Sequence, residues 1–465
     1  MQTPRDMLAE LWTDLGGDRA ALERVGLSGS EPALPSSFRT GAAAQVSIAA
    51  SGLAAAEIWH ARSGQVQTVS VAMRHAVVEC RSERYLRCDG NPPPPAWDAI
   101  AGVYRTGDGR FVRLHTNFPH HRDAVCQVLS CIAEREAVQA ALMQWTGDDF
   151  ETAAYAAGGV VALMRSHDEW MALPQAKAIA ELPLVEITKI GEAAPKPWSA
   201  GERPLEGLRV LDLSRVIAGP VAGRTLAAHG ADVMLVSSPK LPAIPWLTID
   251  TGRGKRACFA DLDTEQGRDT LRNLLADADV FLQGYRPQSL AARGFAPEDA
   301  ARLSPGIIYA SLSAYGRSGP WAARRGFDSL VQCATGFNHA EGQAAGTDGP
   351  KELPAQMLDH ATGYLMAFGA MIAKLRQARE GGSWHVQVSL ARTGQWLWEM
   401  GRLENGLNTP DIPGDAIAAL MEEMPSGFGR LSAVRHAAVL GATPTYWARP
   451  AVKLGSCPPV WGSAK

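Results

Sequence analysis

Short apolar segments alternate with amphipathic helical segments in the second half of the chain. Four apolar runs of strand length lie at 209–213, 231–236, 280–283 and 307–312. Helical patterns at 221–229 and 265–275 separate them. This alternation predicts an α/β fold with a Rossmann-like, doubly wound parallel sheet that helices cover on both faces.

The middle of the chain has a different pattern. Residues 104–114 form two strand-like runs around a glycine-containing turn, which predicts a β-hairpin. Helical patterns follow at 122–142 and 149–157, and 160–167 is also helix-prone. We therefore expect a small α+β domain in this part of the chain.

Two proline-rich stretches divide the chain, because proline fixes the backbone and cannot continue a helix. The first ends near residue 95, and the second begins at 193. The predicted units are a degenerate partial repeat over 1–92, the small α+β domain over 96–192, a proline-rich linker over 193–203, and a large domain with a C-terminal tail over 204–465.

An ungapped internal repeat relates residues 42–73 to residues 359–390. The offset is a constant 317, and nine of the 32 positions are identical. Each segment predicts a long helix rich in small residues, then a glycine turn, then a strand. The shared Ala-Arg-x-Gly and Val-x-Val spacing favours a duplication over a chance match between two similar helix-to-strand corners.

Three segments combine glycines with turns or cations and are candidates for binding an anion. They are 218–220 after the first strand, the basic stretch 252–256, and 284–286 after a later strand. Backbone N–H groups at a helix start attract phosphate, and arginine can donate two parallel hydrogen bonds to it. Each segment can also be an ordinary turn or a solvated loop.

Asp359 precedes the apolar helix predicted at 364–378. An aspartate at such a position commonly caps a helix, but a carboxylate there can also act as a nucleophile. In the other copy of the repeat Ala42 takes its place. Because alanine is a poor cap, we infer that one copy kept a chemistry that the other lost.

Composition limits the class of protein. The chain has 465 residues, 46% of them hydrophobic, and a net charge of -3, which gives no electrostatic footprint for nucleic acid or an anionic membrane. Its seven cysteines lack Cys-x-x-Cys spacing, so we expect neither a zinc site nor a disulfide framework. With no apolar run of membrane-spanning length and no signal-peptide pattern, we expect a cytoplasmic protein.

Taken together, these motifs resemble CoA-transferase family III, the CaiB/BaiF group. The matching segments are 204–213, 218–220, 230–233, 254–256, 285–287, 315–320, 326–328, Asp359 and 386–389, in the family's order and spacing. Residues 40–190 resemble a second, incomplete copy. The chain therefore looks like a tandem fusion that lost its first nucleotide-binding half and its second small domain.

The resemblance implies a CoA-transferase fold and activity. In this family an aspartate, here Asp359, attacks an acyl-CoA thioester and forms an aspartyl anhydride, after which a free carboxylic acid takes over the CoA. CoA is then a substrate, with no permanently bound cofactor and no metal, and the family's interlocked architecture implies a homodimer. The expected CoA-binding residues are Val216, Ala218, Gly219, Lys255, Arg256, Gly284, Tyr285 and Arg286.

The sequence also departs from the family pattern. Phe327 stands where the racemase branch has a histidine, which disfavours an acyl-CoA isomerase or racemase. Basic positions that meet CoA phosphates are replaced by Ser238, Asp263 and Ser313. Three functions stay open: an active CoA-transferase, a CoA-binding partner or regulator without activity, and an isomerase or racemase.

Overall fold

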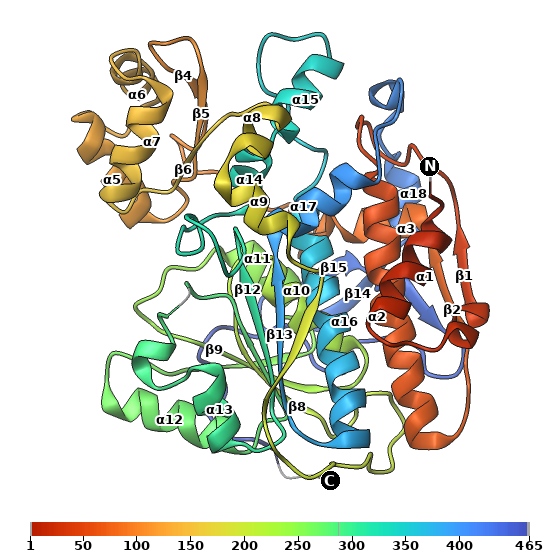
Figure 1. Cartoon of the computed structure of the whole chain (residues 1–465). Coiled ribbons are helices and arrows are strands. Elements are labelled where there is room, and N and C mark those ends of the chain that lie inside the picture. The colour runs from red at the N-terminus through yellow and green to blue at the C-terminus, as the bar shows by residue number, and fades with distance from the viewer. Residues whose placement is uncertain (1, 287, 463–465) are drawn as a thin grey trace.

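A seven-stranded sheet forms the centre of the protein (Figure 1). The structure is a computed structural model that describes residues 2–286 and 288–462. The strand order is β10 (Lys255–Phe259), β9 (Asp232–Ser237), β8 (Arg209–Leu213), β11 (Val280–Gln283), β12 (Ile308–Ser313), β13 (Ser383–Ser389) and β7 (Glu186–Gly191). Neighbouring strands are parallel except β13 and β7. The predicted α/β fold with a parallel sheet is confirmed.

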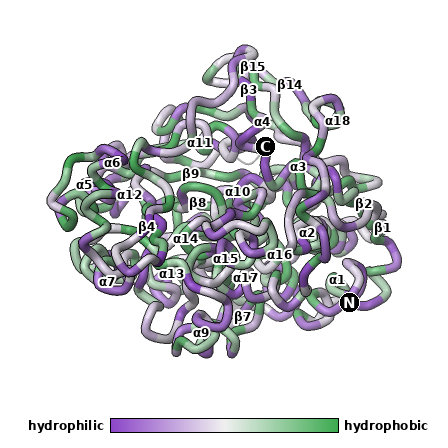
Figure 2. The backbone as a smooth tube through the Cα atoms, turned by 90° about the horizontal axis from the view of Figure 1, so that it is seen from above, coloured by the Kyte–Doolittle hydropathy of each residue, from purple (hydrophilic) through white to green (hydrophobic). Residues whose placement is uncertain are grey.

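Helices cover both faces of this sheet. One face packs against α10 (Ala218–Ala228) and α16 (Met357–Glu380), and α2 (Thr40–Ser63) packs on α16. The other face packs against α12 (Glu265–Ala276) and α13 (Pro297–Leu303). Most residues of α2 and α16 are buried, which explains why both helices are apolar around their whole circumference. Strands β8 and β9 are hydrophobic and lie inside the molecule (Figure 2).

The small domain has its own sheet and core. The predicted hairpin is present as β4 (Gly102–Arg105) and β5 (Phe111–Leu114). The helices α5 (Pro119–Leu129), α6 (Arg135–Leu142) and α7 (Gly147–Ala156) pack against it. The helix expected at 160–167 is wrong, because β6 (Val161–Leu163) pairs with β5 and buries its three residues, and helical structure begins only at His167.

The boundary expected for the small domain at residue 192 is too late. Strand β7 lies inside the range 96–192, yet it pairs antiparallel with β13 and forms the edge of the large sheet. The helices α8 (His167–Ala172) and α9 (Pro174–Ala180) lead from the small domain to this strand, and α9 packs on α17 (Leu390–Glu399). The core of the small domain ends at β6.

The two copies of the repeat form the same succession of elements. At the offset of 317, α2 and α16 have identical bounds, and both end at a glycine, Gly64 and Gly381. Strand β2 (Val69–Ala72) corresponds to β13, and α3 (Met73–Glu79) begins where α17 begins. These matches support the duplication that the sequence predicts.

The strands around β2 also repeat those around β13. Strand β1 (Val25–Ser28) is parallel to β2, as β12 is to β13, and β16 (Ala438–Leu440) is antiparallel to β2, as β7 is to β13. Strand β15 (Gly429–Val434) pairs with β14 (Met421–Ser426) and with β3 (Arg87–Cys88). The C-terminal part of the range 204–465 therefore belongs with the N-terminal copy and extends a sheet other than the large one.

The small domain and the N-terminal copy lie on opposite sides of the large domain (Figures 1 and 2). The remaining helices are α1 (Pro4–Asp14), α4 (Ser82–Tyr85), α11 (Pro245–Thr251), α14 (Asp328–Ala334), α15 (Phe337–Ala344) and α18 (Gly414–Ala418), with 3-10 turns at Arg19–Arg24, Ala291–Arg293 and Gly406–Asn408.

Within the described ranges, α2 alone has the length and hydropathy of a membrane-spanning helix, and 94% of its most apolar window is buried inside the protein.

Equivalent glycines let both long helices approach the strands behind them. A Cβ at Gly369 would lie 2.6 Å from Val386 Cγ1, whereas one at Gly52 would lie 3.0 Å from Val69 Cγ1.

Alanine gains roughly 1 kcal/mol of helix propensity over glycine, and overpacking costs roughly 1–3 kcal/mol. We expect Gly369→Ala to lower the free energy of unfolding by about 1 kcal/mol and Gly52→Ala to leave it nearly unchanged. Urea denaturation followed by circular dichroism measures both, and a larger loss at Gly52 contradicts this account.

Candidate active site

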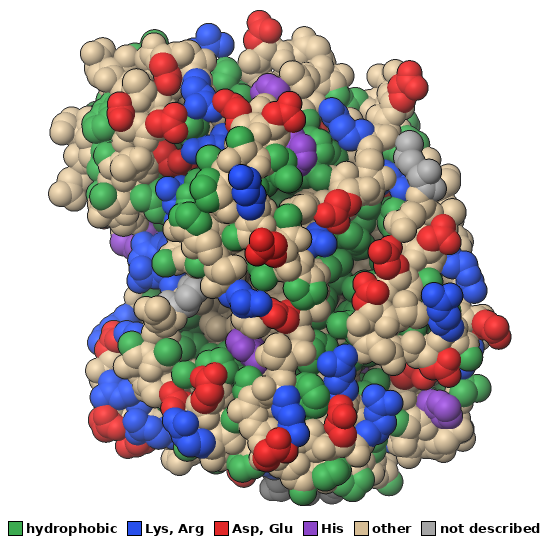
Figure 3. Space-filling model, viewed as in Figure 1, with side chains coloured by type: hydrophobic (Ala, Val, Ile, Leu, Met, Phe, Trp, Pro, Cys, Tyr) green, Lys and Arg blue, Asp and Glu red, His purple; other side chains and the backbone are tan. Residues whose placement is uncertain are grey.

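A cleft of about 370 Å³ lies between the large domain and the small domain. Its walls come from the loop after β8, the ends of β11 and β12, residues 324–327, the first turn of α16, and residues 118–121 of the small domain. Figure 3 shows the surface hollowed between the small domain and the side that carries α12 and α13, with Lys and Arg side chains along the hollow. This is the carboxyl edge of the parallel strands, where α/β sheets bind their ligands.

Asp359 lies in the first turn of α16 and lines the cleft. Its side chain is largely enclosed, because only 6% of the residue is exposed. Its backbone N–H donates a hydrogen bond of 2.9 Å to Oδ2 of Asp328, the buried first residue of α14. The Gln332 amide donates to the other oxygen of Asp328. Two carboxyl groups therefore lie close together at the closed end of the cleft.

Burial is the largest cause that raises the pKa of Asp359 well above its ordinary value, and the negative charges of Asp328 and Glu83 add to it. Burial also raises the pKa of Asp328, against the hydrogen bonds that it accepts. Desolvation disfavours the charged form of an acid, and a second carboxylate nearby disfavours it further. Strongly perturbed carboxyl groups in a cleft are candidates for catalysis.

The structure removes the interpretation of Asp359 as a helix cap. Gln356 is the N-cap of α16 and makes no capping hydrogen bond through its side chain. The carboxylate that accepts a first-turn N–H belongs to Asp328, which comes from another helix. The carboxyl group of Asp359 is therefore not needed to satisfy the backbone of its own helix.

The turn between β8 and α10 places Val216 and Ala218 on the cleft wall. Val216 has a φ of 73°, a left-handed conformation that is strained for a β-branched residue. Such strain is concentrated at functional sites because the surrounding structure must hold it. Val216 and Ala218, which the family resemblance marks as CoA-binding residues, therefore line the same cleft as Asp359.

Gly219 has a different role from the expected one. It is buried, and a Cβ at this position would lie 2.2 Å from the Ser214 Cβ, so glycine is required for close packing of the turn. Gly363 does the same from α16, since a Cβ there would lie 2.4 Å from the Ala218 carbonyl oxygen. Gly219 thus closes the turn before α10, and Gly363 brings α16 against α10; neither glycine lines the cleft.

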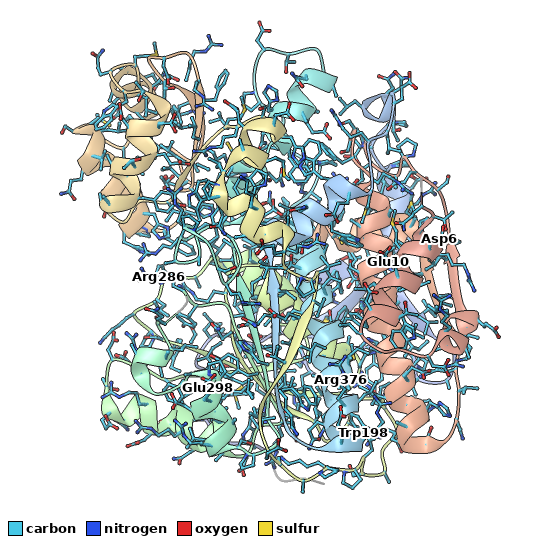
Figure 4. All side chains as sticks on the ribbon, viewed as in Figure 1. Asp6, Glu10, Trp198, Arg286, Glu298 and Arg376 are labelled. Atoms are coloured by element: carbon cyan, nitrogen blue, oxygen red, sulfur yellow. The ribbon has the colours of Figure 1, made fainter. Side chains whose placement is uncertain are left out.

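The segment Gly284, Tyr285 and Arg286 follows β11 and lines the cleft as expected. Figure 4 shows Arg286 beside the gap between the small domain and the α12 and α13 side. Arg215 also lines the cleft, and its guanidinium carbon lies 5.1 Å from the centroid of the Phe118 ring of the small domain. Both guanidinium groups belong to a wall that is suited to a phosphate or a carboxylate.

The expected contacts of Lys255 and Arg256 with CoA are wrong. Lys255 is 1% exposed, and its Nζ lies 2.8 Å from Asp212 Oδ2 and 2.8 Å from the Pro220 carbonyl oxygen. Arg256 forms an ion pair with Asp232. Both residues begin β10, so they lie at the amino end of a parallel strand, away from the cleft. Lys255 instead holds the start of α10 against β8.

Sequence reasoning missed the histidines and arginines that line the cleft beside the small domain. His120 and His121 come from the small domain, and Arg324 and Arg325 come from the loop before α14. Burial and then the ring of His120 lower the pKa of His121 to about 3, so this ring is neutral near pH 7. Among the described residues that line the cleft, Asp359 is the one acidic side chain. No local pattern marks the two histidines, because only the fold brings them to the large domain.

The neighbouring residues Phe327 and His115 form a stacked pair with ring centroids 3.8 Å apart. Phe327 lines the cleft, and His115 is buried behind it. Burial lowers the pKa of His115 to about 3, so this ring is neutral near pH 7. The pair forms an apolar part of the wall in the cleft that Asp359 also lines. In the racemase branch of the family that the sequence resembles, a histidine would stand in place of Phe327 and act as a base.

Of the three replaced basic positions, Ser313 lines the cleft, whereas Ser238 and Asp263 line an adjoining pocket of about 110 Å³. The two cations of that pocket already have partners. Lys240 lies 2.7 Å from Asp261, and Arg293 lies 2.7 Å from Asp263. Across residues 2–286 and 288–462, no group of three or more His, Cys, Asp or Glu side chains is placed to hold a metal ion.

The chain was compared with known proteins and structures. The sequence profile of CoA-transferase family III matches residues 205–457. An acetyl-coenzyme A transferase of Hypoxylon pulicicidum is 31% identical over 324 residues, which are 64% of this chain and 54% of that protein. A succinate–glutarate CoA-transferase of Agrobacterium fabrum is 33% identical over 207 residues, which are 40% of this chain and 51% of that protein.

A crystal structure of a hypothetical protein from Mycobacterium tuberculosis has 32% identity and a TM-score of 0.40, covering 45% of this chain and 58% of that one. The chain thus spans about half the length of these relatives. Because the family profile covers more than half of the 465 residues, the chain belongs to CoA-transferase family III.

Proposed function

We propose that this protein is a CoA-transferase that moves CoA from an acyl-CoA to a free carboxylic acid through covalent intermediates on Asp359. The observation that carries the proposal is the carboxyl group of Asp359, which is enclosed at the end of a cleft with cationic walls. The relatives named above, which act on CoA thioesters by name, support it.

The reaction needs no oxidant, and its protons balance. The Asp359 carboxylate attacks the thioester carbonyl, the C–S bond breaks, and an acyl–aspartyl anhydride and a CoA thiolate form. The thiolate attacks the aspartyl carbonyl, and the anhydride C–O bond breaks to release the donor acid as its carboxylate. Asp359 is then the acyl group of a CoA thioester. The acceptor carboxylate attacks this thioester to give a new anhydride. The thiolate then takes the new acyl group and restores Asp359.

The cleft supplies the electrostatic conditions for these steps. Carboxylate, thiolate and phosphate groups all carry negative charge, and the arginines that line the cleft can donate charge-assisted hydrogen bonds to them. The N-terminal end of α10 at Ala218 adds the positive end of a helix dipole beside Asp359. The stacked Phe327 and His115 rings limit water on one side of the acyl group.

CoA is proposed as a substrate that enters and leaves, with the acyl-CoA and the acid as the partners. The homodimer remains a prediction of the family resemblance. We also propose that the protein acts in the cytoplasm. Its seven cysteines are free, which fits a reducing compartment.

Asp359→Asn tests the covalent step. The amide keeps the shape of the side chain and leaves the hydrogen bond from the residue's backbone N–H to Asp328 in place, so the fold and the affinity for CoA should survive. Transfer between an acyl-CoA and a carboxylic acid should stop, because an amide is too weak a nucleophile. Intact mass spectrometry should show an acyl or CoA adduct on the wild-type chain only. Substantial transfer by the variant would refute the covalent aspartate.

Arg286→Ala tests the place of the CoA phosphates. Loss of one charge-assisted bond costs about 1.5–3 kcal/mol, so the affinity for CoA should fall about tenfold or more. Arg256→Ala is the matched control, because Arg256 pairs with Asp232 at the other end of the strands and should leave the affinity unchanged. Isothermal titration calorimetry measures both variants, and the reverse ranking would place CoA elsewhere.

The pH dependence of acylation tests the two carboxyl groups. Asp359 attacks as a carboxylate, and its raised pKa keeps it protonated above the ordinary range of a carboxyl group, so the acylation rate should rise as the pH rises through that raised pKa. In Asp328→Asn the neighbouring negative charge is absent, so the pKa of Asp359 falls and the rise should move to lower pH. Rapid-quench measurement of CoA release gives the profiles. A shift to higher pH would contradict this assignment.

A further inference from the structure

The side chain of His360 follows the nucleophile in α16 and contacts the N-terminal copy. Its Nε2 lies 3.1 Å from Oε2 of Glu83, a residue of the short helix α4. The His360 ring is 1% exposed, and its Nδ1 is buried without a hydrogen-bond partner among the described residues. One contact between side chains therefore connects the first turn of α16 to the other copy of the repeat.

The repeat shows that this contact occurs with the nucleophile and not without it. At the offset of 317, the equivalents of Asp359, His360 and Glu83 are Ala42, Ala43 and Met400. Met400 lies near the start of α2, since its carbonyl oxygen accepts a hydrogen bond of 3.3 Å from Arg39, the N-cap of that helix. The carboxylate, the histidine and the nucleophile are therefore all present at the start of α16, and the residues at the same offset at the start of α2 are none of the three.

We propose that Glu83 is a positioning residue for Asp359: it holds the His360 ring and with it the first turn of α16. The role rests on the proposed function of Asp359. Glu83 does not line the cleft, so it does not touch the substrate and acts through His360. The N-terminal copy, which lacks a nucleophile of its own, thereby contributes to the site of the other copy.

The geometry supports this role. The first turn of α16 is held at two points, by Asp328 at the backbone N–H of Asp359 and by Glu83 at the His360 ring. The acids that face His360 come from separate elements: Asp250 of α11, Asp328 of α14 and Glu83 of α4. Of these, Glu83 is the one that bonds to the ring. Attack on a thioester requires reacting atoms within about 3–3.5 Å, so a loosened turn slows the reaction.

The residues of the other copy supply the variants. Glu83→Met and His360→Ala each introduce the residue found at the same offset in the other copy. Single-turnover mixing with acetyl-CoA, followed by acid quench and chromatography of free CoA, gives the acylation rate constant. We expect either variant to lower it about tenfold to a hundredfold, with the dissociation constant for CoA changed less than about twofold. Glu83→Gln keeps an acceptor for His360 and should retain most of the rate.

Two controls separate positioning from general stability. Arg81 lies two residues before Glu83 and forms an ion pair with Asp411, with N···O distances of 2.6 and 2.8 Å. Asp411→Asn removes this ion pair. It should leave the acylation rate constant unchanged. Because Glu83 acts through His360, the double variant that combines Glu83→Met with His360→Ala should acylate no more slowly than His360→Ala alone. If Glu83→Met does not fold, as judged by circular dichroism, His360→Ala and Glu83→Gln carry the same comparison.

Several results would overturn the proposal. Positioning through His360 is excluded if Glu83→Met and His360→Ala both acylate at the wild-type rate. It is also excluded if Asp411→Asn lowers the acylation rate constant as much as they do, or if the effects of Glu83→Met and His360→Ala multiply when the two changes are combined. These outcomes differ from a failure of the proposed function. A wild-type chain that releases no CoA from acyl-CoA and gains no mass overturns both, whereas a reactive wild type with equally reactive variants overturns this role alone.

Discussion

The packing of α2 against α16 is the contact on which the rest of the structure depends. Both helices have 24 residues and are buried along most of their length, so neither can exist without apolar cover on every side. Each supplies part of that cover for the other. The sheets around them are completed by exchange: β7 follows the first copy in the chain and joins the second, and β16 follows the second and joins the first.

This exchange explains how a rearranged chain can build one complete site. The small domain follows the first copy in sequence, yet β7 brings it back to the sheet of the second copy, where its residues 118–121 form one wall of the cleft. The opposite walls and Asp359 come from the second copy and its sheet. The contribution of each copy depends on where its flanking strands pair, and sequence order alone does not show this.

Features encoded by local periodicity could be predicted from the sequence, and features that depend on distant pairing could not. The strand at 209–213 is present with the expected bounds, and Asp359 and Arg286 line the cleft. Lys255 and Arg256 follow a glycine as the cations of a phosphate loop do, but they begin a parallel strand, where Lys255 pairs with Asp212 and Arg256 with Asp232. The wall that the small domain contributes, with Phe118, His120 and His121, has no local signal, since only the return of β7 brings it to the cleft.

The two helix starts separate a structural requirement from a chemical one. At α16, Asp328 accepts the N–H of Asp359, and at α2, Glu31 accepts the N–H of Ala42 at 2.7 Å. Burial raises the pKa of both accepting acids, so each copy bears the cost of a buried carboxyl group. Unpaired N–H groups in a buried first turn require such an acceptor in either copy. The N-terminal copy has no nucleophile, yet it keeps Glu31 as the acceptor for its first-turn N–H group. The fold therefore needs the accepting carboxyl group in each copy and does not need the carboxyl group of Asp359.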